Sequence, residues 1–391
     1  MKIAIDIRSA AGEKAGKGWF TFNIVRNLLK IDRKNEYILY CSDFVAGFEE
    51  FKNAKQKRIS GKGILWHINT AIDIYKEKAN MFFAPTSFII PILLPKSIKS
   101  IIVVHDLVAF LSPKTHNKKA VFVEKLLLKT ALKKAYKIVA VSKNTKKDVM
   151  EKFDTDEQKI EVIACAAGGE YGKIKEEILK EFAKKTNLPE KFFLAVGTIE
   201  PRKNYVNLVK AFALIKERFP DYYLIIVGKN GWDFTPVYEE IKRNYLQKYV
   251  HVLGYLSEKS LVNLYNLAEA LVFPSFYEGF GIPPLEAMKS HCAVISSCTS
   301  SLPEVVGDAA LLVDPNSPSQ IAEAMVKITT DKDLKNTLIE KGLKQSEKFS
   351  WEASADKLYE VIHKTPKKGN NTGANNIYIC LNQSGINSLT K

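Results

Sequence analysis

Residues 273–315 read FPSFYEGFGIPPLEAMKSHCAVISSCTSSLPEVVGDAALLVDP, and this stretch decides the interpretation of the whole chain. An apolar run that ends at Pro274 predicts a buried strand. Gly279 and Gly281 predict a flexible loop after it, and Pro283 favours the first turn of a helix, where a missing backbone N–H costs nothing. A strand end, a glycine loop and a helix N-terminus together predict a crevice that binds anions.

Two carboxylates flank this predicted crevice. Glu278 stands at the start of the loop and Glu286 in the first turn of the helix, with seven residues between them. Ionised carboxylates only accept hydrogen bonds, so they suit the hydroxyl groups of a sugar and a ribose. The pattern therefore points to recognition of a sugar nucleotide. Two glutamates at this spacing without such a context are more often solvated surface charge.

The stretch also resembles a known family. The run Glu-Gly-Phe-Gly-x-Pro-x-Leu-Glu-Ala-Met from Glu278 to Met288 is followed by Ser-Ser-x-Pro-Glu-Val from Ser300 and by Gly-Asp-Ala-Ala from Gly307. This order resembles glycosyltransferase family 4, whose members are retaining, nucleotide-sugar-dependent enzymes. The resemblance implies an α/β protein with the GT-B fold, in which two Rossmann-like domains with parallel sheets face each other across a cleft. Within the family, the mannosyl- and rhamnosyltransferase branch is the most similar.

The resemblance and the breaks in periodicity predict the domain organisation. We expect an acceptor-side domain, a linker, a nucleotide-sugar-binding domain, a C-terminal helix that crosses back to the first domain, and a disordered tail. These segments span residues 1–172, 173–190, 191–348, 349–364 and 365–391 respectively.

The resemblance also implies roles for particular residues. The expected catalytic residues are His105, Arg202, Lys203 and Glu278. Residues expected to bind the donor are Gly16, Gly18, Gly254, Tyr255, Gly279, Phe280, Gly281, Ile282 and Glu286. Glu286 would hold the ribose, Glu278 and the glycine-loop backbone the donor sugar, and the two cations the leaving diphosphate.

Placement in the chain supports several of these roles. His105 follows an apolar run at 101–104, and ligands of open α/β sheets lie outside the carboxyl ends of the strands. Arg202 and Lys203 also follow a predicted strand, at 192–196. Three alternatives stay open: the glycines at 16 and 18 only make a tight turn, the histidine is structural, or the two cations are merely exposed.

Two positions depart from the family pattern. Thr198 stands where an arginine directly after the glycine is common, so we assign the arginine role to Arg202. His291 replaces a usual glycine and is expected to change how the helix meets the next strand. Asn204 is predicted to cap the helix that follows it.

Composition bounds the remaining possibilities. The chain of 391 residues is 46% hydrophobic and 26% charged, which is ordinary for globular domains. It contains no apolar run of the ~18 residues that a membrane span needs, and its N-terminus does not read as a signal peptide. The dinucleotide fingerprint is absent, and no histidine or cysteine cluster has metal-ligand spacing. We therefore expect no cofactor and no metal.

The net charge of +15 is concentrated in one segment. Lys125, Lys129, Lys133 and Lys137 are four residues apart, which predicts a stripe on one helix face. The stripe is either a solvated helix face or a site for an anionic membrane surface or a lipid-diphosphate acceptor. No nucleic-acid motif accompanies it, so nucleic acid is not an expected partner.

The combined hypothesis is a cytoplasmic retaining glycosyltransferase, with peripheral attachment to the inner face of the plasma membrane as an added possibility. It transfers a hexose, first choice mannose from GDP-mannose, to a hydroxyl of a glycan or lipid-linked acceptor in surface polysaccharide synthesis. A UDP-sugar and dTDP-rhamnose are the next donors. A sugar-nucleotide epimerase, a phosphorylase of the same fold and a non-catalytic membrane-surface scaffold stay open.

Overall fold

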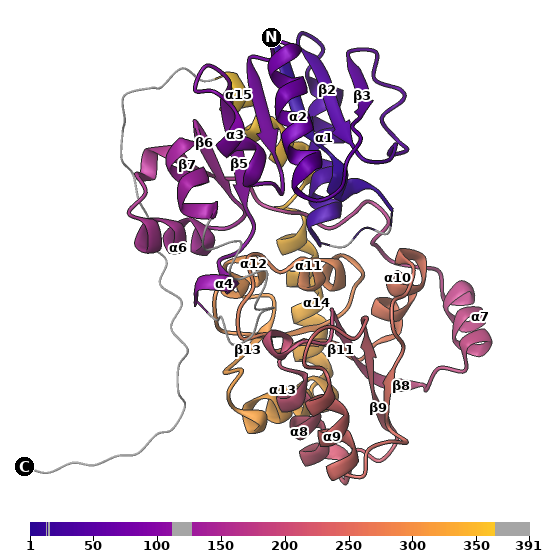
Figure 1. Cartoon of the computed structure of the whole chain (residues 1–391). Helices are drawn as coiled ribbons and strands as arrows, with labels where there is room; N and C mark the ends of the chain where they lie inside the picture. The colour runs from indigo at the N-terminus through magenta and orange to yellow at the C-terminus, as the bar shows by residue number, and fades with distance from the viewer. Residues whose placement is uncertain (13, 15, 112–126, 364–391) are drawn as a thin grey trace, which may run out of the picture.

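The computed structural model describes residues 1–12, 14, 16–111 and 127–363, which form two stacked α/β lobes (Figure 1). Each lobe is built on a sheet in which the strands run parallel. Over the described residues the N-terminal sheet has seven strands, in the order β3-β2-β1-β4-β5-β6-β7. The C-terminal sheet has six, in the order β10-β9-β8-β11-β12-β13. The expectation of two Rossmann-like lobes is confirmed.

Most of the strands form from short runs of β-branched and aromatic residues and are buried on both faces, as parallel sheets require, whereas the polar edge strand at Ala54–Arg58 is not buried. The N-terminal strands are β1 Lys2–Asp6, β2 Glu36–Cys41, β3 Ala54–Arg58, β4 Met81–Ala84, β5 Lys99–Val104, β6 Lys137–Ala140 and β7 Ile160–Val162. The C-terminal strands are β8 Lys191–Val196, β9 Tyr222–Val227, β10 Val250–Val252, β11 Ala270–Phe273, β12 Val294–Ser297 and β13 Leu311–Val313.

Helices connect successive strands and cover both faces of each sheet. In the N-terminal lobe these are α1 Gly16–Ile31, α2 Ile64–Lys76, α3 Ile89–Leu93, α4 Val108–Leu111, a helix over 127–134 and α6 Lys143–Phe153. Next along the chain come α7 Glu176–Thr186, α8 Tyr205–Lys216, α9 Thr235–Arg243, α10 Glu258–Leu267 and α11 Ile282–Lys289. The last are α12 Leu302–Val306, α13 Pro318–Thr330, α14 Lys332–Ser346 and α15 Trp351–His363.

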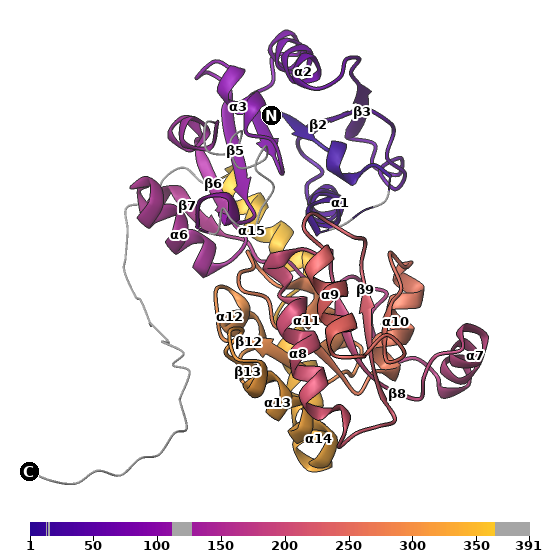
Figure 2. The ribbon, with the colours of Figure 1, turned by 60° about the horizontal axis from the view of Figure 1, so that its bottom comes forward.

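The C-terminal helix α15 returns to the N-terminal lobe and packs against α1 (Figure 2). The rings of Phe20 and Trp351 meet edge to face with centroids 5.8 Å apart. The Ser354 hydroxyl donates to the Ala164 carbonyl at 2.8 Å. One apolar cluster consequently runs from the α1 side of the first sheet into the second lobe. The residue boundaries of the five segments stay a prediction, and residues 364–391 lie outside the described residues.

The carboxyl ends of both sets of strands point toward the contact between the lobes. His105 follows β5, and the glycine loop follows β11 directly opposite it. A Cβ on Gly279 would lie 1.7 Å from the carbonyl oxygen of His105, so only glycine fits between the two loops. The fold thus brings the ligand-binding edges of two Rossmann-like lobes together.

Candidate active site

The glycine loop between β11 and α11 is held by two serines. Ser300 Oγ accepts from the backbone N–H of Glu278 at 2.9 Å. Ser301 Oγ lies 2.9 Å from the Glu278 carbonyl and 2.6 Å from that of Phe280. Gly281 then takes φ +119° before Ile282 opens α11, whose N-terminus has no side-chain cap. These bonds hold the loop in place. In the first turn of α11, Ile282 and Leu285 carry backbone N–H groups, whereas Pro283 and Pro284 have none.

Glu278 is buried between two cations. Its Oε2 lies 2.6 Å from Arg202 Nη1 and its Oε1 lies 2.6 Å from Lys203 Nζ. Both partners come from the turn at Pro201–Lys203 after β8, and Glu200 binds the other side of the guanidinium at 2.6 Å. The structure thus brings three of the predicted catalytic residues into direct contact.

The charges in this cluster stabilise one another. Burial alone raises the pKa of Glu278, but Arg202 and Lys203 outweigh it and hold that pKa below its usual value. Burial lowers the pKa of Lys203, because it disfavours the charged amine, and the adjacent Glu278 carboxylate offsets part of that shift. Around Arg202 the carboxylates prevail over burial and raise its pKa. The site therefore holds two cations, Arg202 and Lys203, and two carboxylates, Glu200 and Glu278.

His105 lies on the opposite side of the contact as a neutral imidazole. Its Nε2 is 2.8 Å from the Pro85 carbonyl, and its ring packs edge-on against Phe20 with centroids 4.9 Å apart. Burial, with a further contribution from Lys17, lowers the pKa of His105 to about 4. The Asp106 carboxylate accepts from the N–H of Val108 at 3.3 Å, so it caps α4 rather than bonding to the imidazole.

The loop at the start of α1 faces the same region. Lys17 Nζ lies 3.7 Å from Asp106 Oδ2, at the tip of β5. A Cβ at Gly18 would come within 2.5 Å of the Ser9 carbonyl, whereas nothing lies within 4 Å of one at Gly16. Gly18 is therefore required by close packing and Gly16 is not.

Glu286 occupies a separate buried position on α11. Its Oε2 accepts a hydrogen bond from the Tyr265 hydroxyl at 2.9 Å. Burial raises the pKa of Glu286 to about 7, although hydrogen bonds from Tyr265 and Tyr171 work against that shift. Burial thus works against the ionised form of Glu286, whereas the cations beside Glu278 favour its ionised form.

Gly254 and Tyr255 lie farther along the edge of the second sheet. The Gly254 carbonyl accepts from the Gly228 N–H at 2.8 Å, and Gly254 takes φ +69°. Tyr255 is 45% exposed and borders a cavity of ≈ 710 Å³ that also includes Trp19 of the N-terminal lobe and Glu258. Both lobes therefore line this hollow at the mouth of the interlobe contact.

Three predictions need correction or limitation. Asn204 stands before α8, but its side chain caps nothing; its Nδ2 donates to the carbonyls of Pro274 at 2.9 Å and Pro315 at 2.6 Å. Lys137 is not on the lysine helix, because that helix ends at residue 134 and Lys137 begins β6. Lys129 and Lys133 are exposed on the helix, whereas Lys125 lies outside the described residues.

Several contacts between the lobes hold the site, and of the residues that make them the sequence marks only Glu304, as support for the fold or the loop. The Glu304 carboxylate accepts from the backbone N–H groups of Lys143 at 3.1 Å and Asn144 at 3.0 Å, across the lobes. The Tyr277 hydroxyl donates to Asp148 at 2.6 Å, also between lobes. Only the Ser-Ser-x-Pro-Glu-Val motif, with its glutamate at 304, could have signalled any of these contacts.

Within the described ranges, no group of three or more histidine, cysteine or acidic side chains could hold a metal ion. Nor, among those residues, is there a helix long and apolar enough to cross a membrane.

Comparison with known proteins gives consistent matches. Residues 175–345 match the family model described as glycosyl transferases group 1. O-antigen chain mannosyltransferase B of Escherichia coli is 34% identical over 250 residues, which are 63% of this chain and 66% of that protein. O-antigen chain mannosyltransferase RfbU of Salmonella typhimurium is 32% identical over 58% of this chain and 60% of that protein. Serotype-specific mannosyltransferase WbdA of Escherichia coli is 31% identical over 71% of this chain and 35% of that protein. The matches thus span between about a third and about two thirds of these relatives' length.

Solved structures share the whole architecture. Sucrose-phosphate synthase from Thermosynechococcus elongatus superposes with a TM-score of 0.76 at 18% identity, over 92% of this chain and 98% of that one. WaaG, described as a glycosyltransferase involved in lipopolysaccharide biosynthesis, superposes with a TM-score of 0.73 at 12% identity, over 93% of this chain and 100% of that one. Anabaena HepE, solved with UDP and glucose, superposes with a TM-score of 0.74 at 16% identity, over 93% of this chain and 100% of that one. At these identities the likeness shows the fold, and the GT-B prediction is confirmed.

Proposed function

This chain belongs to the group 1 glycosyltransferases, and on that premise we propose that it transfers a hexose from a nucleotide sugar to a hydroxyl of a glycan or lipid-linked acceptor. The transfer retains the anomeric configuration. Mannose from GDP-mannose is the first choice of donor, and the product belongs to surface polysaccharide synthesis.

The observation that carries the proposal is the buried Arg202–Glu278–Lys203 cluster at the carboxyl edge of the second sheet. Glu200 and Glu278 already pair with the two cations, so a donor diphosphate would compete with these carboxylates for Arg202 and Lys203. A donor diphosphate placed between the cations and the N-terminus of α11 would have its developing negative charge stabilised as the sugar leaves. Glu278 would then be free to accept hydrogen bonds from the sugar hydroxyls.

The other residues complete a donor site in this proposal. Glu286 accepts from the ribose hydroxyls, with Tyr265 and Tyr171 holding the carboxyl in place. The backbone at Gly254 and Tyr255 contacts the base. His105, already neutral and fixed by the Pro85 carbonyl, lies beside the sugar and does not act as a cation.

The chemistry proposed at the sugar rests on the family resemblance. It is a same-face displacement, in which the departing phosphate takes the acceptor's proton. Arg202 and Lys203 supply the positive charge that a metal supplies elsewhere, so the proposed reaction runs without one.

Mannose is preferred because the relatives with 31–34% identity are named mannosyltransferases, two of them of the O-antigen chain. The test is a thermal-unfolding panel with GDP, UDP, dTDP and ADP, each with magnesium and with EDTA. A ligand that binds the folded state raises the melting temperature by mass action. We expect GDP to give the largest shift, equal in both buffers and lost in Glu286→Ala. A larger shift with another nucleotide would reassign the donor; no shift with any would favour the scaffold hypothesis.

A further inference from the structure

Polar side chains follow three adjacent strands of the N-terminal sheet, at the edge that faces the other lobe. Arg8 follows β1, Ser87 follows β4 and His105 follows β5, and these strands are neighbours in the sheet. At roughly 4.8 Å between neighbouring strands, the ends of β1 and β5 are about 10 Å apart. Arg8 and Ser87 have no role in the donor site proposed above, yet they lie on the same edge as His105.

The guanidinium of Arg8 is fixed in place by two neighbours. Asp6, which is completely buried, accepts from Arg8 Nε at 3.0 Å and from Nη2 at 2.8 Å. The Arg8 Cζ atom also lies 3.6 Å from the centroid of the Trp66 ring. A guanidinium has five N–H groups, and the described residues provide acceptors for three of them, the third being His67. One N–H on each terminal nitrogen is therefore left to bind a ligand, and the side chain is 25% exposed.

The contact with Arg8 determines the tautomer of His67. Arg8 Nη1 lies 3.5 Å from His67 Nε2, and because arginine only donates, Nε2 must be the acceptor. The proton of the ring is consequently on Nδ1, which donates to Ser87 Oγ at 3.3 Å. Burial, with a further contribution from Arg8, lowers the pKa of His67 to about 4, so the ring is neutral. The Ser87 hydroxyl thus accepts from His67, and its own proton has no acceptor in the part of the chain that the structure describes.

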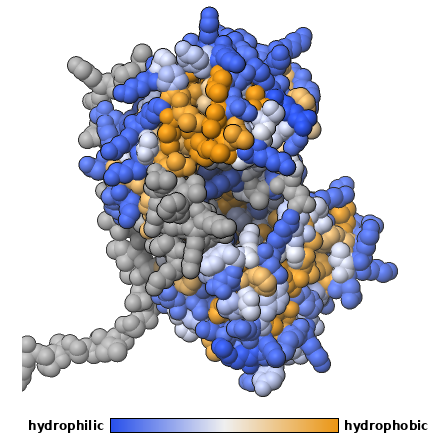
Figure 3. Space-filling model, viewed as in Figure 1, coloured by the Kyte–Doolittle hydropathy of each residue, from blue (hydrophilic) through white to orange (hydrophobic). Residues whose placement is uncertain are grey.

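His67 comes from α2, a helix with apolar residues on both its outer and its inner side. Exposed residues such as Ile68 and Ile72 cover the outer surface, where Figure 3 shows apolar side chains gathered on the upper lobe. On the inner side Trp66 is buried against the first sheet. His67 therefore places a polar group at the strand ends instead of extending the apolar core.

The charges of this cluster balance. The Arg8 guanidinium is paired with the Asp6 carboxylate, and the neutral His67 ring adds no charge. At the end of β5, Lys17 is likewise paired with Asp106 at 3.7 Å. The cluster offers hydrogen-bond donors without excess positive charge, so it suits neutral hydroxyl groups better than phosphates.

We propose that Arg8 and Ser87 bind the acceptor through adjacent hydroxyl groups of a neutral sugar. The two open N–H groups of Arg8 would donate to one pair of hydroxyl oxygens, and the Ser87 hydroxyl would donate to a neighbouring one. His67 is a positioning residue, because it acts on the acceptor only through Arg8 and Ser87. The acceptor role rests on the proposed sugar transfer, since it places the acceptor sugar beside the donor sugar at His105.

The test is saturation-transfer NMR of the full chain with GDP and methyl α-glycosides of mannose, glucose, galactose, rhamnose and N-acetylglucosamine. We expect the wild type to bind at least one glycoside. Arg8→Lys retains a cation beside the buried Asp6 but lacks the paired N–H groups, so it should bind that glycoside at least tenfold more weakly. Ser87→Ala should bind it about fivefold more weakly, as expected for one hydrogen bond. The rise in melting temperature that GDP causes should be the same in both variants.

Two substitutions at His67 test the positioning role. The amide of His67→Gln can still accept from Arg8 and donate to Ser87, so this variant should bind the glycoside within twofold of the wild type. His67→Leu can do neither and should bind about as weakly as the Arg8 variant. Equal losses in the glutamine and leucine variants would contradict the positioning role.

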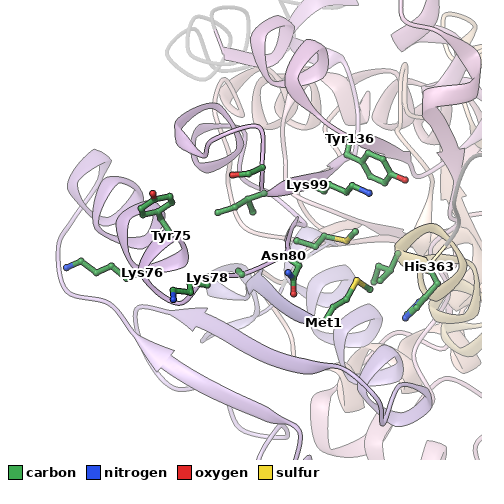
Figure 4. Close-up of a pocket in the computed structure, with 13 residues that line it drawn as sticks. Met1, Tyr75, Lys76, Lys78, Asn80, Lys99, Tyr136 and His363 are labelled. Carbon is green, nitrogen blue, oxygen red and sulfur yellow. The ribbon is translucent and has the colours of Figure 1, made fainter.

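Lys76→Ala is the matched control. Lys76 is exposed at the other end of α2, where it lines a hollow of ≈ 740 Å³ at the amino edge of the sheet (Figure 4). This variant should bind the glycoside as the wild type does. Thermal unfolding would check that every variant is folded, and if Arg8→Lys is not, Ser87→Ala decides alone.

Two results would overturn the proposal: failure of the wild type to bind any of the glycosides, and unchanged binding by a folded Arg8→Lys or Ser87→Ala variant. Tighter binding of inorganic pyrophosphate than of any glycoside, weakened in Arg8→Lys, would assign the open N–H groups to an anionic ligand instead. A wild type that binds a glycoside but transfers no sugar from any nucleotide sugar would contradict the proposed function and still support a sugar site at Arg8.

Discussion

Lys203 Nζ lies 2.6 Å from Glu278 Oε1, and the two side chains are only 10% and 11% exposed. The two residues are 75 positions apart and come from different loops at the edge of one sheet. Because Arg202 binds the other carboxylate oxygen, removing Lys203 would leave Glu278 paired but would halve the positive charge of the cluster.

The first prediction concerns this pair. Lys203→Ala should lower kcat by about 100- to 1,000-fold, the usual cost of removing one group that stabilises a developing charge. The matched control is Lys191→Ala, since Lys191 forms an exposed ion pair with Asp221 at 2.9 Å in the same lobe. Steady-state donor turnover would measure both. Equal losses in the two variants would contradict a specific role for Lys203.

The second prediction concerns Glu304, which binds the start of α6 from the other lobe. Burial raises the pKa of this carboxyl, and the two backbone N–H groups partly counter that shift. Glu304→Ala would remove the acceptor for both N–H groups and should lower kcat/KM roughly tenfold or more, as expected for hydrogen bonds to a charged group. Small-angle scattering should show the lobes farther apart.

Glu304→Gln separates this positioning role from a general loss of structure. Its amide oxygen keeps one of the two acceptors, whereas its NH2 group cannot accept from the other backbone N–H. We therefore expect kcat/KM and the scattering profile to lie between those of the wild type and the alanine variant. If the glutamine variant is as impaired as the alanine variant, the hydrogen bonds across the lobes do not explain the loss of kcat/KM.

The third prediction follows from Glu286, whose pKa is raised from 4.5 to about 7 by burial. Between these pH values the folded chain holds a proton that the unfolded chain has released. This contribution to stability is therefore complete below pH 4.5 and is lost as the pH rises through 7. At 1.36 kcal/mol per unit it amounts to at most about 3 kcal/mol.

Glu286→Gln removes that titration. We expect the wild-type melting temperature to fall relative to the variant between pH 5 and pH 7.5. Glu258→Gln is the companion variant, because Glu258 has a pKa raised to about 7 by burial and Glu170 and lies near Glu286. A difference between wild type and Glu286→Gln that stays constant with pH would show that the carboxyl does not titrate in this range.

The fourth prediction concerns His291, which takes φ +58° at the turn between α11 and β12. A side chain in this left-handed conformation costs about 1–2 kcal/mol, and glycine avoids most of that cost while adding freedom to the unfolded chain. His291→Gly should therefore raise the free energy of unfolding by roughly 0.5–1 kcal/mol and leave donor turnover unchanged. Denaturant unfolding would measure the change; a destabilised variant would show that the imidazole makes a needed contact.

Local sequence patterns predicted much of the fold. Buried runs such as those at 101–104 and 192–196 form strands because parallel sheets are apolar on both faces. Gly281 and the prolines after it place the start of α11 where the sequence indicated. His291 was marked as unusual from sequence, and its left-handed backbone gives the physical reason why glycine is common there.

Local sequence patterns could not predict which distant residues form hydrogen bonds with one another. The Tyr265 hydroxyl reaches Glu286 from α10, although the two residues are 21 positions apart in the chain. Asn204 looked like a helix cap, yet its amide ties two distant loops together through Pro274 and Pro315. Lys137 fitted a helical stripe by spacing, but the chain had already turned into β6. Spacing cannot show which groups tertiary packing brings together.

The most direct test of the central claim is an NMR time course of GDP-mannose with the full chain and an extract of lipid-linked glycans, in EDTA. We expect GDP to appear together with a mannosyl product of the same anomeric configuration as the donor, and we expect neither in Lys203→Ala. A product of inverted configuration, or equal turnover by Lys203→Ala, would contradict the account of the Arg202–Glu278–Lys203 cluster as the site of transfer.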